Sequence, residues 1–231
     1  MLDEHDPPPD EQGVVLLVVP QGSAAFDALA QVEVRVFPES AADLALNADA
    51  SEYLIVASST QGHITLHHVV RVCHCCPAFG PSGLWFLEDI SRSQQGVTAA
   101  ELGSVLTADG IDLTRTFSVE CNFGIGPRLS RDLGAPYSAL AYAGLFGRVD
   151  GADAVLAWVN AQARRSLSRL GFAVRPLWPT DLGAPETVGD MSIVDHSYRP
   201  ISLYRRENAG ALQRLAEFKM PTVLVAPAIG R

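Results

Sequence analysis

Basic residues, cysteines and long apolar runs are all scarce in this sequence. Its 231 residues include 17 lysines and arginines against 26 aspartates and glutamates, a formal net charge of -9. A nucleic-acid-binding surface needs a basic excess, so we expect no nucleic-acid partner. No apolar run approaches the ~20 residues that span a bilayer. The first apolar run follows an acidic, proline-rich leader, whereas a signal peptide has a basic one. We therefore expect a cytoplasmic protein without a membrane span.

The four cysteines form a poor disulfide framework, because Cys73, Cys75 and Cys76 crowd together and Cys121 lies far away. Neighbouring histidines raise the alternative of a metal site, with His63 and His67 on the strand face of Cys73. Alternate strand residues lie ~6–7 Å apart, so only close neighbours could share a zinc ion. No second cysteine pair completes such a site. We expect buried strand residues and no metal.

The chain divides into a short tail and one domain. Residues 1–12 are acidic and contain three consecutive prolines, which predicts a disordered tail. Residues 13–231 contain no obvious linker, and 48% of the chain is hydrophobic against 19% charged. This composition supports a sizeable core, and we predict a single domain over residues 13–231.

Hydrophobic periodicity predicts a mixed α/β sheet flanked by helices. A strand over 13–20 precedes a helix capped by Ser23 and extending to about Phe37, on whose apolar stripe Glu33 also falls. Strands are expected at 52–59 and 64–76, joined by a hairpin, and again at 153–160, 173–178, 199–206 and 222–228. Helices are expected at 40–50, 98–106, 136–146, 161–170 and 209–218, and Asn160 can cap the helix at 161–170. Residues 78–113 are harder to assign, and within them 79–90 shows no clean period.

Residues 116–123 alternate between apolar and polar side chains. Phe117, Val119, Cys121 and Phe123 alternate with Thr116, Ser118, Glu120 and Asn122. A strand with this period has one apolar and one polar face. If a water-filled cleft lies against the polar face, Glu120 can act there as a general base. The alternative interpretation is that the polar face is a solvated edge of the strand with no catalytic role. Cys121 as a nucleophile is disfavoured, because a thiol on an apolar face is usually inert.

Four segments together resemble a known fold. They are "QVEVRVFPES" at 31–40, "HHVVRV" at 67–72, "TFSVECNFGI" at 116–125 and "DAVLAWVNAQARRSLSRLGF" at 153–172. In order and spacing they resemble the GNAT acyltransferases, particularly the branch of acyl-homoserine-lactone synthases and long-chain N-acyl amino acid synthases. The resemblance spans roughly residues 14–175. It implies a GNAT-like sheet whose central parallel strands splay apart, with the pantetheine arm of a thioester donor in the gap.

The resemblance also implies roles for individual residues. Glu120 matches the general base, and Arg71 matches an arginine that would orient the acceptor. Glu33 is either a second carboxylate facing the acceptor or a structural ion-pair partner of Arg71. Donor-binding positions follow on the same resemblance: Phe123, Gly124 and Gly126 at the pantetheine and the oxyanion, and Arg128, Arg131 and Gly134 at the phosphate.

The phosphate loop departs from the family pattern at one position. Arg131 to Pro136 follows Arg-x-x-Gly-x-Gly/Ala until its last residue, where proline lacks the N–H that would donate to an anion. An enzyme whose donor is an acyl carrier protein would tolerate the loss of this N–H, because that donor presents only a single phosphodiester. An ordinary loop and helix start is the alternative interpretation.

A second departure concerns the acceptor. Phe123 stands where the lactone synthases have an arginine three residues after the glutamate, which argues against S-adenosylmethionine chemistry and lactone formation. The resemblance then favours acyl transfer from acyl-CoA or acyl carrier protein to an amine or amino acid, with no metal. A non-catalytic binder of acyl carrier or lipid and a plain acetyl-CoA N-acetyltransferase remain alternatives. Tyr137, Tyr142, Phe146 and Trp158 would line an acyl tunnel or belong to the core.

Overall fold

The computed structural model describes residues 13–60, 63–93, 96–125, 134–147, 151–177, 199–217 and 222–225. The predicted tail at residues 1–12 lies outside these ranges. Among the described helices, none combines the length and apolar character needed to cross a bilayer.

The chain alternates between strands and helices along its length. The strands are β1 Gly13–Pro20, β2 Ser51–Thr60, β3 His63–His74, β4 Thr116–Gly124, β5 Ala154–Val159, β6 Arg175–Pro176, β7 Arg199–Tyr204 and β8 Thr222–Val225. The helices are α1 Ala24–Val36, α2 Ser40–Asn47, α3 Trp85–Ser93, α4 Ala99–Ala108, α5 Gly134–Gly147, α6 Ala161–Arg169 and α7 Ala209–Glu217. Short 3₁₀ turns include η1 Ala48–Ala50, directly after α2, and η2 Pro77–Phe79.

One mixed sheet of eight strands runs through the described part of the chain in the order β6-β7-β5-β4-β3-β2-β1-β8. Strands β1 to β4 form an antiparallel meander. Strand β5 joins β4 in parallel, and β8 joins β1 in parallel. The predicted mixed α/β sheet is confirmed, and its central parallel pair is β4 and β5.

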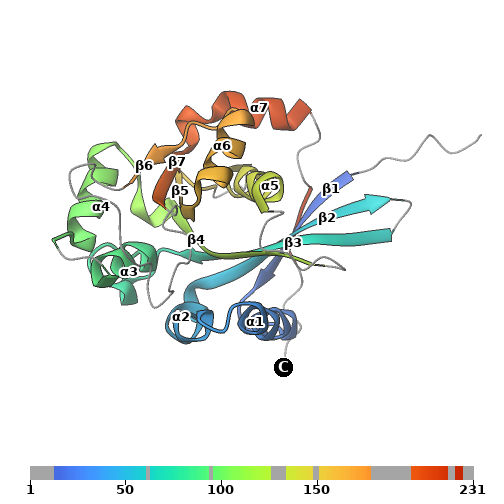
Figure 1. The fold of residues 1–231 in the computed structure, drawn as a ribbon, viewed down its shortest axis with the longest axis horizontal. Helices are drawn as coiled ribbons and strands as arrows, with labels where there is room; N and C mark the ends of the chain where they lie inside the picture. The colour runs from blue at the N-terminus through green and yellow to red at the C-terminus, as the bar shows by residue number, and fades with distance from the viewer. Residues whose placement is uncertain are drawn as a thin grey trace, which may run out of the picture.

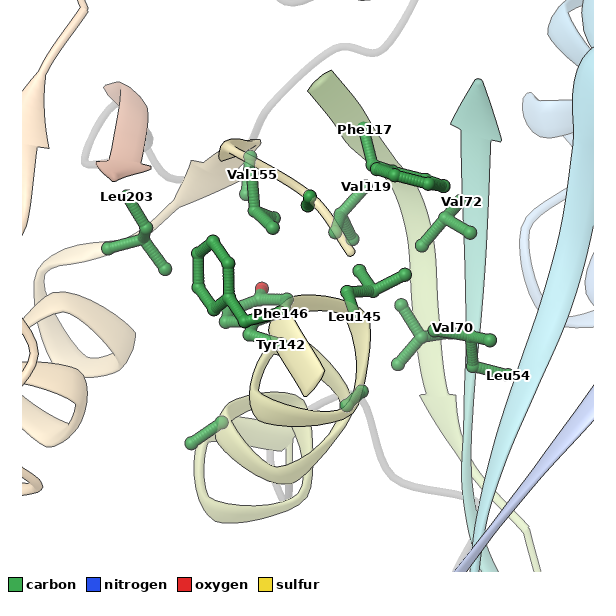
Figure 2. Packing of buried hydrophobic residues seen from close by; sticks show 14 of the residues in the cluster. Leu54, Val70, Val72, Phe117, Val119, Tyr142, Leu145, Phe146, Val155 and Leu203 are labelled. Atoms are coloured by element: carbon green, nitrogen blue, oxygen red, sulfur yellow. The ribbon is translucent and has the colours of Figure 1, made fainter. Parts of the chain in front are cut away.

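Helices cover both faces of this sheet (Figure 1). Helices α1 and α2 lie against one face, where Phe26 of α1 packs with Tyr53, Val69 and Phe123. Helices α3 and α4 form a neighbouring cluster with β5. Helices α5, α6 and α7 cover the opposite face. The larger core lies under α5, where Tyr142, Leu145 and Phe146 pack against the central strands (Figure 2).

Side chains at the helix ends explain several boundaries. The Ser23 hydroxyl accepts a hydrogen bond from the Phe26 N–H at 3.1 Å, and Asn160 Oδ1 accepts from the Ala163 N–H at 2.7 Å. Both are the caps that the sequence predicts. Thr98 and Glu101 form a reciprocal capping box at the start of α4.

Helix α3 was not predicted from the sequence, because it is too short to show a helical period. Trp85 contacts Cys73 and Phe79, whereas Phe86, Leu87 and Ile90 enter the α4 cluster. Nine residues are fewer than the roughly 11–18 over which a helical period can be recognised in a sequence, so the pattern is too short to identify.

Candidate active site

Glu120 occupies a β-bulge at the centre of the sheet. Strand β3 pairs Arg71 with Cys121 but the next residue, Val72, with Val119, so Glu120 has no partner across that ladder. A bulge inserts one residue into a strand, bends it, and re-aims the side chains on either side. The sequence analysis did not foresee this irregularity, because the apolar alternation runs through it without interruption.

The bulge overturns the predicted division of β4 into one apolar and one polar face. Phe117 and Val119 pack on the α5 side of the sheet, whereas Cys121 and Phe123 pack on the α1 side. One extra residue reverses the alternation, because side chains change faces with a period of two. The prediction that these four apolar side chains share a face is therefore wrong. Ser118 is also buried, with 1% of its surface exposed, rather than lining an open polar face.

Strands β4 and β5 part immediately before the bulge. Their parallel pairing covers only Thr116 to Val119 and Ala154 to Ala157, and β4 then continues for five residues to Gly124 without β5. Trp158 is the first β5 residue beyond the paired segment. The splayed central pair expected of this fold class is present, with Glu120 at the point of divergence.

Backbone direction decides which groups face this gap. The Ile125 N–H donates to the His67 carbonyl at 2.9 Å, and in this register Val69 and Phe123 form the next hydrogen-bonded pair. The Phe123 N–H therefore points toward β3, not toward the gap. The N–H groups of Asn122 and Gly124 point the other way, toward the edge that β5 leaves open.

A buried network holds Arg71 beside Glu120. Arg71 Nε donates to both Glu33 carboxylate oxygens, at 3.1 and 3.0 Å, and the Tyr53 hydroxyl donates to Glu33 Oε2 at 2.7 Å. Arg71 Nη1 donates to Asn47 Oδ1 at 2.5 Å. Glu33 and Asn47 have no exposed surface, and Arg71 exposes 1%. The ion pair that the sequence analysis weighs for Glu33 and Arg71 is thus formed.

The charge of this pair shapes the titration of its neighbours. Burial alone would lower the pKa of Arg71, but Glu33 and Glu120 raise it above its ordinary value, so the cation persists. Burial, followed by the Glu33 carboxylate, raises the pKa of the Tyr53 hydroxyl. Tyr53 therefore stays protonated and continues to donate to Glu33.

Glu120 has the proton affinity of a base that works near neutral pH. Burial raises its pKa from the ordinary value of 4.5 to about 7, against the opposing effects of Arg71 and of the hydrogen bond from the Ser118 hydroxyl. Asp89 of α3 and Asp43 of α2 raise it further. A carboxylate in this range can accept a proton and release it again.

Within the described ranges, the cysteines and histidines are not arranged as a reactive or metal-binding site. Burial is the main cause that raises the pKa of Cys73 to about 12 and that of Cys121 well above its ordinary value, so both thiols stay protonated. Burial lowers the pKa of His68 to about 4, so its imidazole is neutral at pH 7. Among the described residues, no group of three or more His, Cys, Asp or Glu side chains is arranged to hold a metal ion.

Several donor-binding candidates lie beyond the described residues. Gly126, Arg128 and Arg131 fall in the segment 126–133, outside the described ranges, so their proposed contacts with pantetheine and phosphate are untested. Gly134 begins α5, which agrees with a helix N-terminus at the end of the predicted loop.

Tyr142 and Phe146 line no open tunnel. They expose 2% and 0% of their surface and belong to the core under α5 (Figure 2). This core position is the second of the two roles that the sequence analysis considers for them. Trp158 is partly exposed beside the gap, and its ring lies 5.7 Å from that of Phe86 on α3.

Comparison with solved structures finds the same architecture in proteins described as acyl-homoserine lactone synthases. BjaI is described as a CoA-dependent acyl-homoserine lactone synthase, with SAM and isopentyl-CoA in one structure and with MTA in another. Each matches with a TM-score of 0.50 and 14% identity over 93% of this chain and 94% of that one. LasI, an AHL synthase, matches with a TM-score of 0.49 and 12% identity over 94% of this chain and 99% of that one. No protein-family model and no curated protein sequence matches the chain.

This chain has the acyl-homoserine lactone synthase fold. The match covers almost the full length of both chains, so the splayed sheet and the helices on its two faces belong to one shared architecture. The fold expected from the four sequence segments is confirmed. An identity of 14% shows the fold alone, so the chemistry has to be argued from the residues of this chain.

Two members of the buried network in this synthase fold were missed by the sequence analysis. Tyr53 lies in a continuously apolar strand, where an aromatic residue is expected for packing alone. Asn47 ends a short helix, and asparagine is ordinary at such a position. The one available signal was Glu33, whose place on the apolar stripe of α1 demands buried partners.

Proposed function

We propose that this protein is an N-acyltransferase, moving an acyl group from a pantetheine thioester to a primary amine. One observation carries the proposal: a carboxylate with a pKa of about 7 lies at the bulge where the central parallel strands part. The gap between splayed strands leaves β4 backbone groups free to pair with an extended ligand, as an added strand would.

Glu120 is the general base in this proposal. It takes one proton from the acceptor ammonium, and the neutral amine nitrogen attacks the thioester carbonyl carbon. A C–N bond forms, the C–S bond breaks, and the electron pair of that bond leaves with sulfur. The nitrogen loses its second excess proton as the tetrahedral intermediate collapses, and the departing thiolate receives a proton. The transfer is redox-neutral.

Backbone N–H groups of β4 would stabilise the oxyanion. Asn122 and Gly124 present their N–H groups at the edge facing the gap, whereas Phe123 directs its own to β3. We therefore transfer the proposed donor-binding role of Phe123 to its two neighbours. Gly126, Arg128, Arg131 and Gly134 stay proposed contacts of the pantetheine arm and phosphate.

Arg71 is a positioning residue in this scheme. Its guanidinium is already bound by Glu33 and Asn47, and it lies close enough to Glu120 to lower the pKa of that carboxyl. Without Arg71, Glu120 would hold its proton more tightly and be a poorer base near neutral pH. Glu33 acts in turn by fixing Arg71.

The name of one structure that shares the fold favours acyl-CoA as donor, because BjaI is described as CoA-dependent and was solved with isopentyl-CoA. The acidic net charge of the whole chain does not exclude a carrier-protein donor, which would need a local basic surface. Arg128 and Arg131 would contribute to such a surface.

The proposal is tested with purified protein, acyl-CoA donors from two to sixteen carbons, and a pool of primary amines and amino acids. Free CoA is measured by thiol titration and products by mass spectrometry. We expect CoA release that depends on the acceptor, together with a matching N-acyl product. Absence of any product with both acyl-CoA and acyl carrier protein donors would contradict it. A rise in melting temperature with acyl-CoA in that case would support a non-catalytic binder.

A further inference from the structure

Glu120 lacks a ladder partner on both neighbouring strands. The bulge leaves it unpaired with β3, and the parallel pairing with β5 ends one residue earlier, at Val119. Residues inside a sheet are ordinarily held through backbone hydrogen bonds to the strands on either side. The ladders therefore do not fix Glu120, and its side chain needs another anchor if the carboxylate is to act as a base.

Ser118 has both of the partners that Glu120 lacks. It pairs with Cys73 of β3 and with Leu156 of β5, and 1% of its surface is exposed. Both partners pack with side chains of α3, so Ser118 faces that side of the sheet as well. The backbone of Ser118 is therefore held from two sides in the segment just before the bulge.

A hydrogen bond joins the side chains of these two residues. The Ser118 hydroxyl donates to Oε1 of Glu120. An ionised carboxylate can only accept, so serine is the donor whenever Glu120 is charged. This bond ties the carboxylate of an unpaired residue to a residue that two ladders hold. Since Oε1 is engaged, Oε2 is the oxygen left to take a proton from the acceptor.

Other charged or titratable groups interact with Glu120 electrostatically. They are Arg71 and Cys73 of β3, Cys121 of β4, Asp43 of α2 and Asp89 of α3. Arg71 lowers the pKa of the carboxyl, both aspartates raise it, and the two thiols stay protonated. Of the described residues, only Ser118 forms a hydrogen bond with this carboxylate.

We propose that Ser118 is a positioning residue for the general base: its hydroxyl holds Oε1 of Glu120 and turns Oε2 toward the acceptor ammonium. This inference rests on the proposed N-acyltransferase function. A hydrogen bond to the charged form of a carboxyl also favours that form, so Ser118 keeps Glu120 ionised at a lower pH than burial alone would allow. Ser118 acts through Glu120 and exchanges no proton with the substrate.

Three substitutions at Ser118 and one control test the proposal. Ser118→Ala removes the hydroxyl, Ser118→Thr keeps it, and Ser118→Cys keeps the size with a weaker donor. The cysteine variant takes the place of the alanine variant if the latter does not fold. Ser202→Ala is the control, because Ser202 also exposes 1% of its surface and pairs with Leu156 from β7, but its hydroxyl bonds to Tyr204.

The titration of Glu120 is measured without any substrate. Glutamate labelled with ¹³C at the side-chain carboxyl gives one NMR signal per residue, and the signal missing from Glu120→Gln is that of Glu120. We expect a midpoint at about pH 7 in the wild type, Ser118→Thr and Ser202→Ala. In Ser118→Ala the midpoint should rise by about one pH unit or more, because the bond to the charged form is lost, and in Ser118→Cys by less.

The pH dependence of acyl transfer should follow the same order. The rising limb of kcat/KM moves up with the midpoint in Ser118→Ala, so turnover at neutral pH should fall by about fivefold or more. Part of this loss should return above about pH 9, and the remainder, in kcat with KM for the acyl donor unchanged, reflects the lost orientation of Oε2. Ser118→Thr and Ser202→Ala should keep the wild-type profile.

The outcomes separate this inference from the proposed function. An unchanged Glu120 midpoint and pH profile in Ser118→Ala, or an equal shift in Ser202→Ala, would overturn the role of Ser118 while the transferase function stands. A fall in turnover that is equal at every pH, with the midpoint unchanged, would also overturn it, because only a structural role remains. A midpoint that rises in Ser118→Ala and returns in Ser118→Thr, in a protein that transfers no acyl group to any acceptor, would support the contact and contradict the function.

Discussion

Glu120 combines a backbone position and a proton affinity that suit general-base catalysis. The bulge leaves it without a cross-strand partner, and burial raises its pKa to about 7. Asp43 and Asp89 act in the same direction as burial, while Arg71 and Ser118 oppose it. The balance places the carboxyl where it is half-ionised near neutral pH, which is the most useful range for repeated proton transfer.

Replacing Glu120 with glutamine should abolish most turnover without unfolding the protein. The substitution keeps the shape and removes the base, so we expect kcat to fall by about 10²–10⁴-fold. In the wild type, kcat/KM should rise about tenfold per pH unit below pH 7 and level off above about pH 8; the variant should lose this dependence. Glu101→Gln is the control, since glutamine also serves in a capping box. Wild-type turnover in Glu120→Gln would exclude this residue as the base.

The same residue should make stability depend on pH. Unfolded Glu120 releases its proton near pH 4.5, but folded Glu120 retains it up to about pH 7. Proton binding therefore favours the folded state at low pH, and this contribution is lost as pH rises through that interval. Glutamine mimics the protonated form, so Glu120→Gln should melt at a higher temperature than wild type at pH 8 and at a similar temperature at pH 4.5. An equal difference at both pH values would contradict the raised pKa.

At the scale of elements, α1 and β3 are joined by a buried ion pair. Glu33→Gln leaves the Arg71 cation at 1% exposure without its carboxylate, which should lower the free energy of unfolding by about 3–5 kcal/mol. Urea denaturation measures the loss. The double variant Glu33→Leu/Arg71→Met should recover much of it, because neither charge of the buried pair remains. Glu207→Gln breaks an exposed pair with Arg175 and should change stability by about 1 kcal/mol or less.

Helix α5 approaches β1 closely at Gly144. A Cβ at that position would lie 2.2 Å from Leu16 Cδ2, in a core where Leu16 has no exposed surface. Gly144→Ala improves helix propensity, yet overpacking should dominate and destabilise the protein by about 1–3 kcal/mol. In a Leu16→Ala background the Gly144→Ala substitution should cost less than it does in the wild type, which a double-mutant cycle by thermal unfolding measures. A more stable Gly144→Ala protein would show that the contact is looser than this.

At the scale of the whole molecule, the sequence predicted most helices and strands but not the irregularities within them. Ser23 and Asn160 cap helices as predicted, and the alternation of strands and helices indicated the mixed sheet. The bulge at Glu120 was hidden, because the apolar alternation continues across it and only pairing with β3 reveals the extra residue. The roles of Tyr53 and Asn47 were hidden too, because their partners are 20 and 24 residues away in the sequence.

The division of the chain into a tail over 1–12 and one domain over 13–231 stays a prediction. The eight-stranded sheet draws on segments from β1 to β8, which favours one folding unit. Truncation of residues 1–12 should therefore leave the melting temperature and the acyl transfer unchanged.

Acyl transfer at Glu120 is tested most directly by mass spectrometry of lipid extracts from a bacterial host that expresses the wild type, Glu120→Gln or Glu101→Gln. We expect new N-acyl species with the wild type and with Glu101→Gln, and none with Glu120→Gln at equal protein levels. The same N-acyl species in all three extracts would contradict a catalytic role for Glu120.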